Sequence, residues 1–374
     1  MQTKPKGPGL FLAQFSGRPG FENLENSCKT AAANGYTCIQ IPSWDSKLFN
    51  LGCAAESKDY CDHLVGKIME WGLKDGVTEI ATHLQGQLMA VHPAYLQLFR
   101  KFGPPELQTT NDPKALYKWA EEQMLLAVKA SKNLGLNAIP SFTGSFLWPY
   151  IYPWPQLSQE FVGTAFKILG KRWEPVFDAA SDADQSIAFE LHPGEDVHDG
   201  DTFARFLETV GGHEAAGINF DPSHFVLMNL DYVGFIETWA DRIKAYHVKD
   251  AETASTANQG FYGAFQPWGK RNTRFRSLGD GQVQFADIEE ALEEKGLIGI
   301  PRVLEWECAI KGPEQGLREG APFIRALINA EPLPEIVPAT KSNAVFDDFV
   351  KTELDHGQVA SMLGVSLDEI RSAA

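Results

Sequence analysis

Residues 187–195, IAFELHPGE, decide the fold that this sequence predicts. Successive side chains of a strand point to opposite faces, so the apolar residues at positions 187, 189 and 191 share one face. The other face carries Glu190 and His192 towards the C-terminal end of the stretch. We therefore expect a strand with a buried apolar back and a front that ends in a carboxylate and an imidazole.

The same pattern returns three times further along the chain, in the segments GINFDPSHF, KAYHVKDAE and RVLEWE. Each segment has one apolar face, and the other face carries side chains that commonly bind metal ions. These side chains are Asp221, His247, and Glu305 with Glu307. Four strands are thus expected to present a polar group near their ends.

Strand and helix patterns alternate eight times along the chain, which requires a parallel sheet. Eight units favour an α/β protein with a closed (β/α)8 TIM barrel. The first strand is not followed by a GxGxxG motif, so an open dinucleotide-binding sheet lacks its main support. The predicted strands are 9–15, 36–42, 79–84, 136–142, 187–195, 217–221, 243–249 and 301–307. The predicted helices are 23–34, 57–71, 113–134, 158–180, 202–210, 232–240, 286–294 and 315–328.

The chain divides, on this pattern, into a catalytic barrel over residues 1–332 and a C-terminal part over residues 333–374. The second part begins in a proline-rich stretch that is typical of a linker, and ends in residues predicted to form one or two amphipathic helices. We expect this extension to be a candidate pairing element in a homo-oligomer.

Composition limits the possible partners and location of the protein. The net charge of -16 argues against nucleic-acid binding, which depends on clustered Lys and Arg. The five cysteines contain no CxxC pair and no zinc-finger spacing, which indicates free thiols in a reducing compartment. No signal sequence and no apolar segment of membrane length are recognisable. We therefore expect a cytoplasmic protein with neither a nucleic-acid nor a membrane partner.

The four strand-end groups have the chemistry of a divalent-metal site. Catalytic groups of a TIM barrel lie at the C-terminal ends of its strands, where Glu190, Asp221, His247 and Glu305 fall. Three carboxylates and one imidazole form a hard to borderline ligand set, for which we expect Mn2+, with Mg2+, Co2+ or Zn2+ as alternatives. Glu307 repeats the inward direction of Glu305, so either of the two could be the ligand.

The motifs FELHPGE, NFDPSH, YHVKD, RFRSLGDGQV and VLEWE resemble the xylose-isomerase-like barrel superfamily, in particular its sugar (phosphate) isomerase/epimerase branch. That branch includes ketose 3-epimerases and inosose dehydratases. The resemblance implies a metal held by Glu190, Asp221, His247 and Glu305. It also implies that His224 and Glu195 contact the substrate. An arginine common after the metal histidine of ketose 3-epimerases is absent, so Lys249 or an arginine of the 250–282 segment would have to replace it.

We expect the reaction to be proton transfer next to a carbonyl, with Glu190 and Glu305 as base and acid on two faces of an enediolate. His83, His192 and His224 are assigned to the hydroxyl groups of a sugar or cyclitol substrate. Return of the proton gives an isomerase or epimerase. Loss of a β-substituent gives the alternative, a lyase or dehydratase acting on a keto-sugar, inosose or 3-keto-glycoside. A non-catalytic sugar-binding barrel and a DNA-repair endonuclease are weaker alternatives.

Two long loops are expected to border the site. The aromatic loop SFLWPYIYPWP, residues 145–155, is either packed filler or a wall for a ring-shaped substrate. The 250–282 segment exceeds the usual loop length, which indicates a functional or a disordered loop. Its Arg274, with Arg271 and Arg276, could bind a substrate phosphate or could pair with acidic neighbours.

Overall fold

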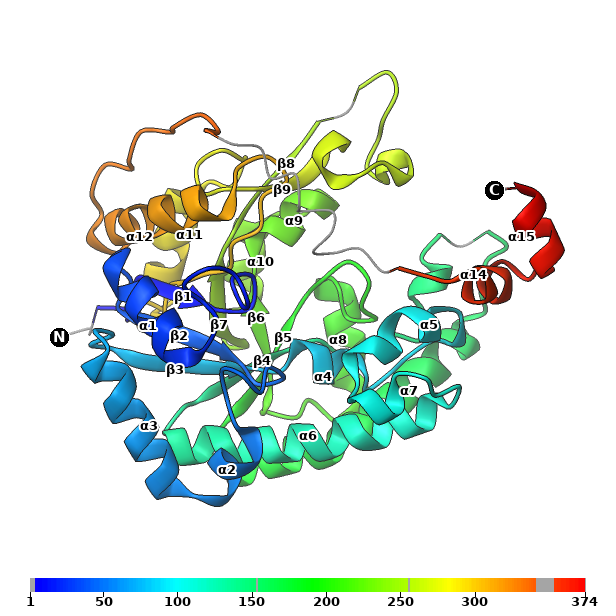
Figure 1. Cartoon of the computed structure of the whole chain (residues 1–374), viewed down its shortest axis with the longest axis horizontal. Helices are drawn as coiled ribbons and strands as arrows, with labels where there is room; N and C mark the ends of the chain where they lie inside the picture. The colour runs from blue at the N-terminus through cyan, green and yellow to red at the C-terminus, as the bar shows by residue number, and fades with distance from the viewer. Residues whose placement is uncertain (1–3, 153, 255, 341–352, 374) are drawn as a thin grey trace.

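The computed structural model describes residues 4–340 and 353–373, except residues 153 and 255. Eight parallel strands form a nearly closed barrel surrounded by helices (Figure 1), which confirms the predicted fold class. The strands lie in the order β3-β2-β1-β10-β7-β6-β5-β4. They are β1 Gly9–Phe11, β2 Cys38–Pro42, β3 Gly76–Ala81, β4 Ala138–Ser141, β5 Ser186–Glu190, β6 Ala216–Phe220, β7 Ile243–Val248 and β10 Val303–Leu304.

The two outer strands of this order, β3 and β4, meet through Thr82. Its backbone N–H donates to the carbonyl oxygen of Pro140 at 2.7 Å, and its hydroxyl donates to the same oxygen at 3.0 Å. The barrel is therefore closed at this seam by one residue that follows β3, whereas parallel ladders join the other strands, with register shifts in the β2–β3 and β6–β7 pairs.

The predicted helices are present between the strands. They are α1 Leu24–Ala33, α3 Lys58–Glu70, α6 Pro113–Leu134, α7 Gln159–Asp182, α8 Gly200–Thr209, α10 Tyr232–Trp239, α11 Phe285–Glu294 and α12 Pro313–Asn329. The cap signals of α6 operate as expected, because the side chain of Asp112 accepts from the Lys114 N–H and Gly135 ends the helix at a φ of 72°. Short helices α2 Leu51–Glu56, α4 His83–Gln87, α5 Leu96–Phe99 and α9 Pro222–Met228 occupy loops.

The alternating pattern of β5 has the predicted consequence. Phe189 points outward and packs against Trp173 of α7 and Phe206 of α8, with ring centroids 4.8 and 5.6 Å apart. Its neighbour Glu190 points the opposite way, is only 1% exposed, and lies inside the barrel. Burial of the aromatic side chains on the outer face thus fixes the direction of the carboxylate on the inner face.

The prediction of a strand over residues 79–84 was wrong at its end. β3 stops at Ala81, and His83 begins the short helix α4. The turn is possible because Gly86 packs directly on the end of β4, where an added Cβ would lie 2.2 Å from the Phe142 carbonyl oxygen. His83 therefore reaches the barrel interior from a helix.

The long segment after β7 is ordered over its described residues. It forms an antiparallel ribbon of β8 Asp250–Thr253 and β9 Thr273–Arg276. Asp250 anchors the part of this segment that follows β9, since its carboxylate accepts hydrogen bonds from the backbone N–H groups of four residues. These are Ala251, Gly279, Gly281 and Val283, at 2.8 to 3.2 Å.

The described C-terminal residues form α14 His356–Leu363 and α15 Leu367–Ala373. In Figure 1 they lie beside α5 and away from α12, and Lys101 donates to the Glu353 carbonyl oxygen at 2.7 Å. The predicted helical residues 344–352 fall outside the described part of the chain. The domain division at 332/333 and the pairing role of the extension stay predictions.

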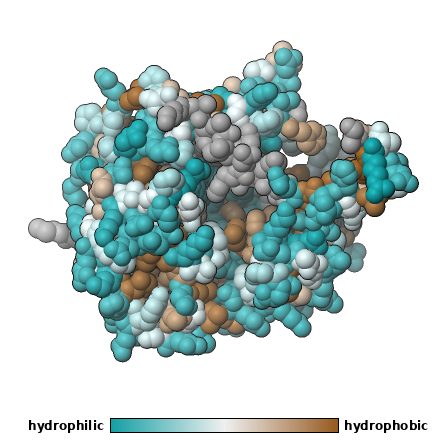
Figure 2. Space-filling view, in the orientation of Figure 1, coloured by the Kyte–Doolittle hydropathy of each residue, from teal (hydrophilic) through white to brown (hydrophobic). Residues whose placement is uncertain are grey.

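The molecular surface in Figure 2 is mainly hydrophilic. Hydrophilic residues cover most of the face shown in Figure 2, around a central hollow beside which hydrophobic residues gather. All five cysteines have free thiols. Over the described residues, we find no helix that combines the length and the apolar character needed to cross a bilayer. The cytoplasmic location stays a prediction.

Replacement of Asp250 by Ala should lower the free energy of unfolding by about 2–3 kcal/mol, because four buried or partly buried backbone N–H groups lose a charged acceptor. Burial raises the pKa of Asp250 to about 6, so the carboxylate is ionised at neutral pH. Urea unfolding of this variant and of the exposed control Asp182→Ala measures the difference. Equal unfolding midpoints for the two variants would refute the anchoring role.

Candidate metal and proton-transfer site

Four side chains converge inside the C-terminal end of the barrel. Glu190 ends β5, Asp221 follows β6 and caps α9, His224 lies in the first turn of α9, and Glu305 follows β10. One ligand atom from each lies within 4.8 Å of the others. The structure therefore brings together the three carboxylates that the sequence assigned to the metal.

The predicted imidazole ligand, His247, lies beside two of the three carboxylates. Its Nδ1 lies 3.0 Å from Glu190 Oε2 and 3.1 Å from Glu305 Oε2. The set of side chains with which His247 could hold a metal ion, however, consists of His83 and Glu190. Asp221 groups with His224 instead. Both imidazoles thus flank the carboxylates, and either could complete the ligand set.

The geometry distinguishes Glu305 from Glu307. Glu305 lies in the cluster of three carboxylates with Glu190 and Asp221. Glu307, in contrast, directs its Oε2 to Lys249 Nζ at 2.7 Å. The same ammonium lies 3.2 Å from Glu305 Oε2 and 3.6 Å from Asp221 Oδ2. Lys249, expected at the substrate, is therefore a buried positive charge that links Glu307 to the cluster of three carboxylates.

The side chains fit a divalent cation. Asp221 Oδ2 is buried without a hydrogen-bond partner, although His224 Nε2 lies 3.3 Å away at ion-pair distance. Three buried carboxylates repel one another unless cations compensate them. A cation held by Glu190, Asp221, Glu305 and one of the two histidines would satisfy the unpaired oxygen and balance the charge.

The surrounding charges alter the pKa values of these groups. Burial opposes ionisation of Glu190, but hydrogen bonds from His224, His247 and His83 hold its pKa well below the usual value. Burial would lower the pKa of His224, yet the charge of Asp221 raises it to about 9. Likewise the pKa of His247 rises to about 10 against burial, mainly because of Glu305. Without a metal the imidazoles thus carry protons, which metal binding would release.

Neutral amides hold the carboxylates in place, and these residues were not predicted. Gln14 donates to Glu305 Oε1 at 2.7 Å, and Asn219 donates to Glu190 Oε2 at 3.0 Å. Gln40 Oε1 lies 3.0 Å from His247 Nε2, so a proton on this nitrogen would leave Nδ1 free as a ligand. The available signal was their position, because Gln40 and Asn219 lie on the polar faces of predicted strands.

The residues assigned to the substrate differ in position. His83 Nε2 lies 3.1 Å from Glu190 Oε2, and the ring of His192 packs against that of His224 with centroids 4.2 Å apart. Burial lowers the pKa of His192 to about 3, so this ring is neutral. Glu195 is 2% exposed and accepts the Gly144 N–H at 2.6 Å.

Arg274 is not brought to the carboxylates. Its Nε donates to Glu252 Oε1 at 2.7 Å across the β8–β9 ribbon, and Arg276 pairs with the other oxygen of Glu252. The acidic partner that the sequence left open for these arginines is therefore present.

Comparison with known proteins agrees with this architecture. A family model described as xylose isomerase-like TIM barrel matches residues 28–327. An inosose dehydratase from Lacticaseibacillus casei is 27% identical over 139 residues, which are 37% of this chain and 46% of the relative. The chain thus matches less than half the length of this relative.

Solved structures show the same fold. A xylose isomerase domain protein from Planctomyces limnophilus has a TM-score of 0.57 and 18% identity, covering 88% of this chain and 99% of that one. The 3-keto-D-glucoside 4-epimerase YcjR from E. coli has a TM-score of 0.54 and 15% identity, covering 85% and 98%. Two further similar structures contain zinc and magnesium, respectively.

Metal binding should depend on Asp221, whose buried Oδ2 accepts no hydrogen bond. We expect Asp221→Asn to abolish saturable Mn2+ binding, and Asn219→Ala to weaken it by about ten- to a hundredfold because Glu190 loses a positioning hydrogen bond. Calorimetric titration with MnCl2, with the exposed Asp182→Asn as control, tests this. Wild-type affinity in the Asp221→Asn variant would contradict the site.

Glu195 should make stability fall as the pH rises. Burial raises its pKa from 4.5 to about 8, so between these values the folded protein binds more protons than the unfolded chain. The contribution is fully present below pH 4.5 and is lost as the pH rises through 8, with a slope of at most about 1.4 kcal/mol per pH unit. Urea unfolding from pH 5 to 8 should therefore give a flatter profile for Glu195→Gln. Parallel profiles for wild type and variant would show that Glu195 does not titrate there.

Proposed function

Because the chain belongs to the xylose isomerase-like TIM barrel family, we propose that it is a divalent-metal-dependent sugar isomerase or epimerase that moves a proton next to a carbonyl. The observation that carries this proposal is the convergence of Glu190, Asp221 and Glu305, with an imidazole, within 4.8 Å. The proteins that the chain resembles include an inosose dehydratase and, in fold, a 3-keto-D-glucoside 4-epimerase.

Glu190 is the proposed proton acceptor. His83 and His224 lie against its two oxygens at 3.1 and 2.8 Å, and these contacts fix the orientation of the carboxylate. Its lowered pKa keeps it ionised at neutral pH, as a base must be before it acts.

Glu305 is the proposed counterpart on the other side of the substrate. Two strands, β6 and β7, separate β5 from β10 in the sheet, so the two glutamates approach the centre from different directions. Gln14 and Lys249 hold Glu305, and Lys249 also contacts Glu307, a carboxyl whose pKa burial raises. Lys249 thus links Glu307 to Glu305.

The metal supplies Lewis-acid polarisation of the substrate carbonyl when it is bound. We propose Mn2+ for this role, held by Glu190, Asp221, Glu305 and either His247 or His224. The oxygen-rich ligand set supports this choice, and Mg2+, Co2+ or Zn2+ would use the same side chains. The neutral His192 and the buried Glu195 are proposed to contact hydroxyl groups of a keto-sugar or cyclitol.

Elimination is the second candidate reaction, because the same Glu190 could remove the first proton before a β-substituent leaves. The match to an inosose dehydratase favours keeping it. The two reactions share proton removal and differ in the next step, so product analysis separates them.

Proton exchange in D2O tests the function. The Mn2+-loaded protein is incubated with ketoses, inososes and 3-keto-glycosides, and the products are analysed by NMR and mass spectrometry. Deuterium next to the carbonyl with all oxygens retained is expected for an isomerase or epimerase, whereas loss of water or an aglycone indicates a lyase.

Glu190→Gln should reduce the exchange rate by about 10²- to 10⁴-fold, because the acceptor is removed while the shape is kept. Glu305→Gln should have a comparable effect. Arg274→Lys, which keeps the charge beside Glu252 away from the centre, is the control. Exchange that persists in both glutamate variants would rule out these roles.

A further inference from the structure

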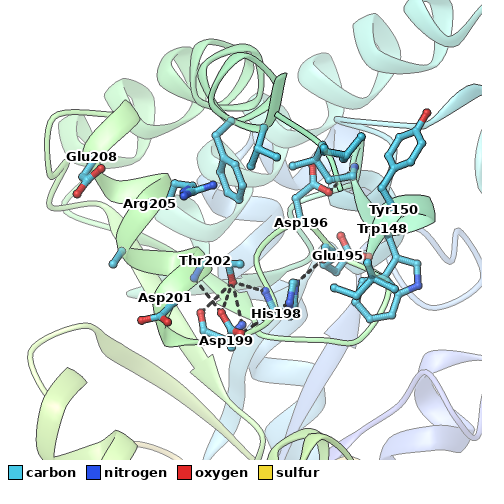
Figure 3. Close-up of a pocket in the computed structure, with 16 residues that line it drawn as sticks. Trp148, Tyr150, Glu195, Asp196, His198, Asp199, Asp201, Thr202, Arg205 and Glu208 are labelled. Atoms are coloured by element: carbon cyan, nitrogen blue, oxygen red, sulfur yellow. Dashed lines mark hydrogen bonds and ion pairs between the residues drawn. The ribbon is translucent and has the colours of Figure 1, made fainter. Parts of the chain in front are cut away.

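A cavity of about 510 Å³ lies between the aromatic loop and helices α7 and α8, with Glu195 in its lining (Figure 3). Its volume is within the range of about 300–1,000 Å³ that is typical of sites for drug-sized ligands. Trp148 and Tyr150 lie on one side, and Arg205 and Glu208 lie on the other. None of the roles assigned above uses this space beyond Glu195 at its edge.

The aromatic wall of the cavity is preformed. Asp196 accepts the hydroxyl of Ser145 at 2.6 Å and the backbone N–H groups of Phe146 and Leu147 at 2.8 and 2.7 Å. The Trp148 ring packs edge-on against His198 at a centroid distance of 5.4 Å. The loop that the sequence left open between packed filler and a wall is thus fixed against one carboxylate and lines a cavity.

The charges of the cavity select against an anionic ligand. Five carboxyl side chains line it, at positions 195, 196, 199, 201 and 208, against the single arginine Arg205. Glu195 adds no charge below its pKa of about 8, which burial raises, so the repulsion comes from the aspartates and Glu208. Arg205 itself donates to Gln159 Oε1 at 3.0 Å. A phosphate or carboxylate would be repelled here, whereas hydroxyl groups can donate to acceptor oxygens and a ring can pack on Trp148.

One turn of the chain connects this cavity with the proton-transfer centre. In the segment HPGE, the Glu195 N–H donates to the His192 carbonyl oxygen at 3.1 Å. The His192 ring contacts His224 in the centre, and Glu195 lines the cavity. A substrate that reaches both places would therefore extend past this turn.

We propose that the cavity is a subsite for a second, uncharged ring, and that the substrate is a glycoside whose sugar ring lies at the carboxylate centre. The inference rests on the proposed function only in placing a sugar at that centre. The second ring could be another sugar or an aromatic aglycone, because both present an apolar face to Trp148 and neither carries a negative charge.

Calorimetry on the Mn2+-loaded protein tests the subsite with glucose, methyl β-D-glucoside, cellobiose and phenyl β-D-glucoside. At least one of the two-ring probes should bind about tenfold or more tightly than methyl β-D-glucoside. A preference for cellobiose identifies the second ring as a sugar, and a preference for phenyl β-D-glucoside identifies it as an aromatic group.

Two variants locate the effect. Ala204→Phe on α8 fills the cavity, and Trp148→Ala removes its aromatic wall. Both should cancel the advantage of the two-ring probe and leave methyl β-D-glucoside binding unchanged. Ala286→Phe, an exposed alanine on α11, is the matched control and should keep the advantage.

Equal affinity of the wild-type protein for one-ring and two-ring probes, or no binding of any probe, would overturn the subsite. An advantage that survives both cavity variants would overturn it as well. Proton exchange in D2O, which tests the proposed reaction, is measured independently of these binding experiments. Absent exchange together with a Trp148-dependent advantage would reject the proposed chemistry and retain the subsite.

Discussion

The mutual repulsion of three buried carboxylates is the constraint on which the rest of this structure depends. Glu190, Asp221 and Glu305 are each less than 10% exposed and share one small region. Their charge requires the buried ammonium of Lys249 and two protonated imidazoles, and it provides the electrostatic reason for binding a divalent cation. The hydrogen bonds from Gln14 and Asn219 then determine which oxygens face the centre.

Much of this arrangement was predictable because it follows from local pattern. The alternation in residues 187–195 placed Phe189 outward and Glu190 inward, and the strand-and-helix rhythm predicted the barrel. The strand prediction failed at His83, where the close approach of Gly86 to β4 allows a helix that periodicity does not reveal. The role of Gln14 could not be predicted, because its partner Glu305 is 291 positions away and a glutamine carries no distinctive motif.

The loops around the site are organised by single acidic residues. Asp250 accepts hydrogen bonds from the residues that follow β9, and Asp196 accepts them from the start of the aromatic loop. In both cases one buried carboxylate satisfies several backbone N–H groups, which would otherwise be costly to bury. These hydrogen bonds hold the described residues of both segments in place.

The seam at Thr82 joins two strands that are each followed by a loop of the site. All candidate metal ligands come from β5, β6, β7 and β10, which are consecutive strands of the ladder. His83 and the aromatic loop follow β3 and β4, the strands that meet at the seam. Selection could therefore remodel the aromatic loop after β4 to accept new ring systems while Glu190 and its contact His83 stay in place. The seam would then mark the part of the protein in which substrate preference evolves most readily.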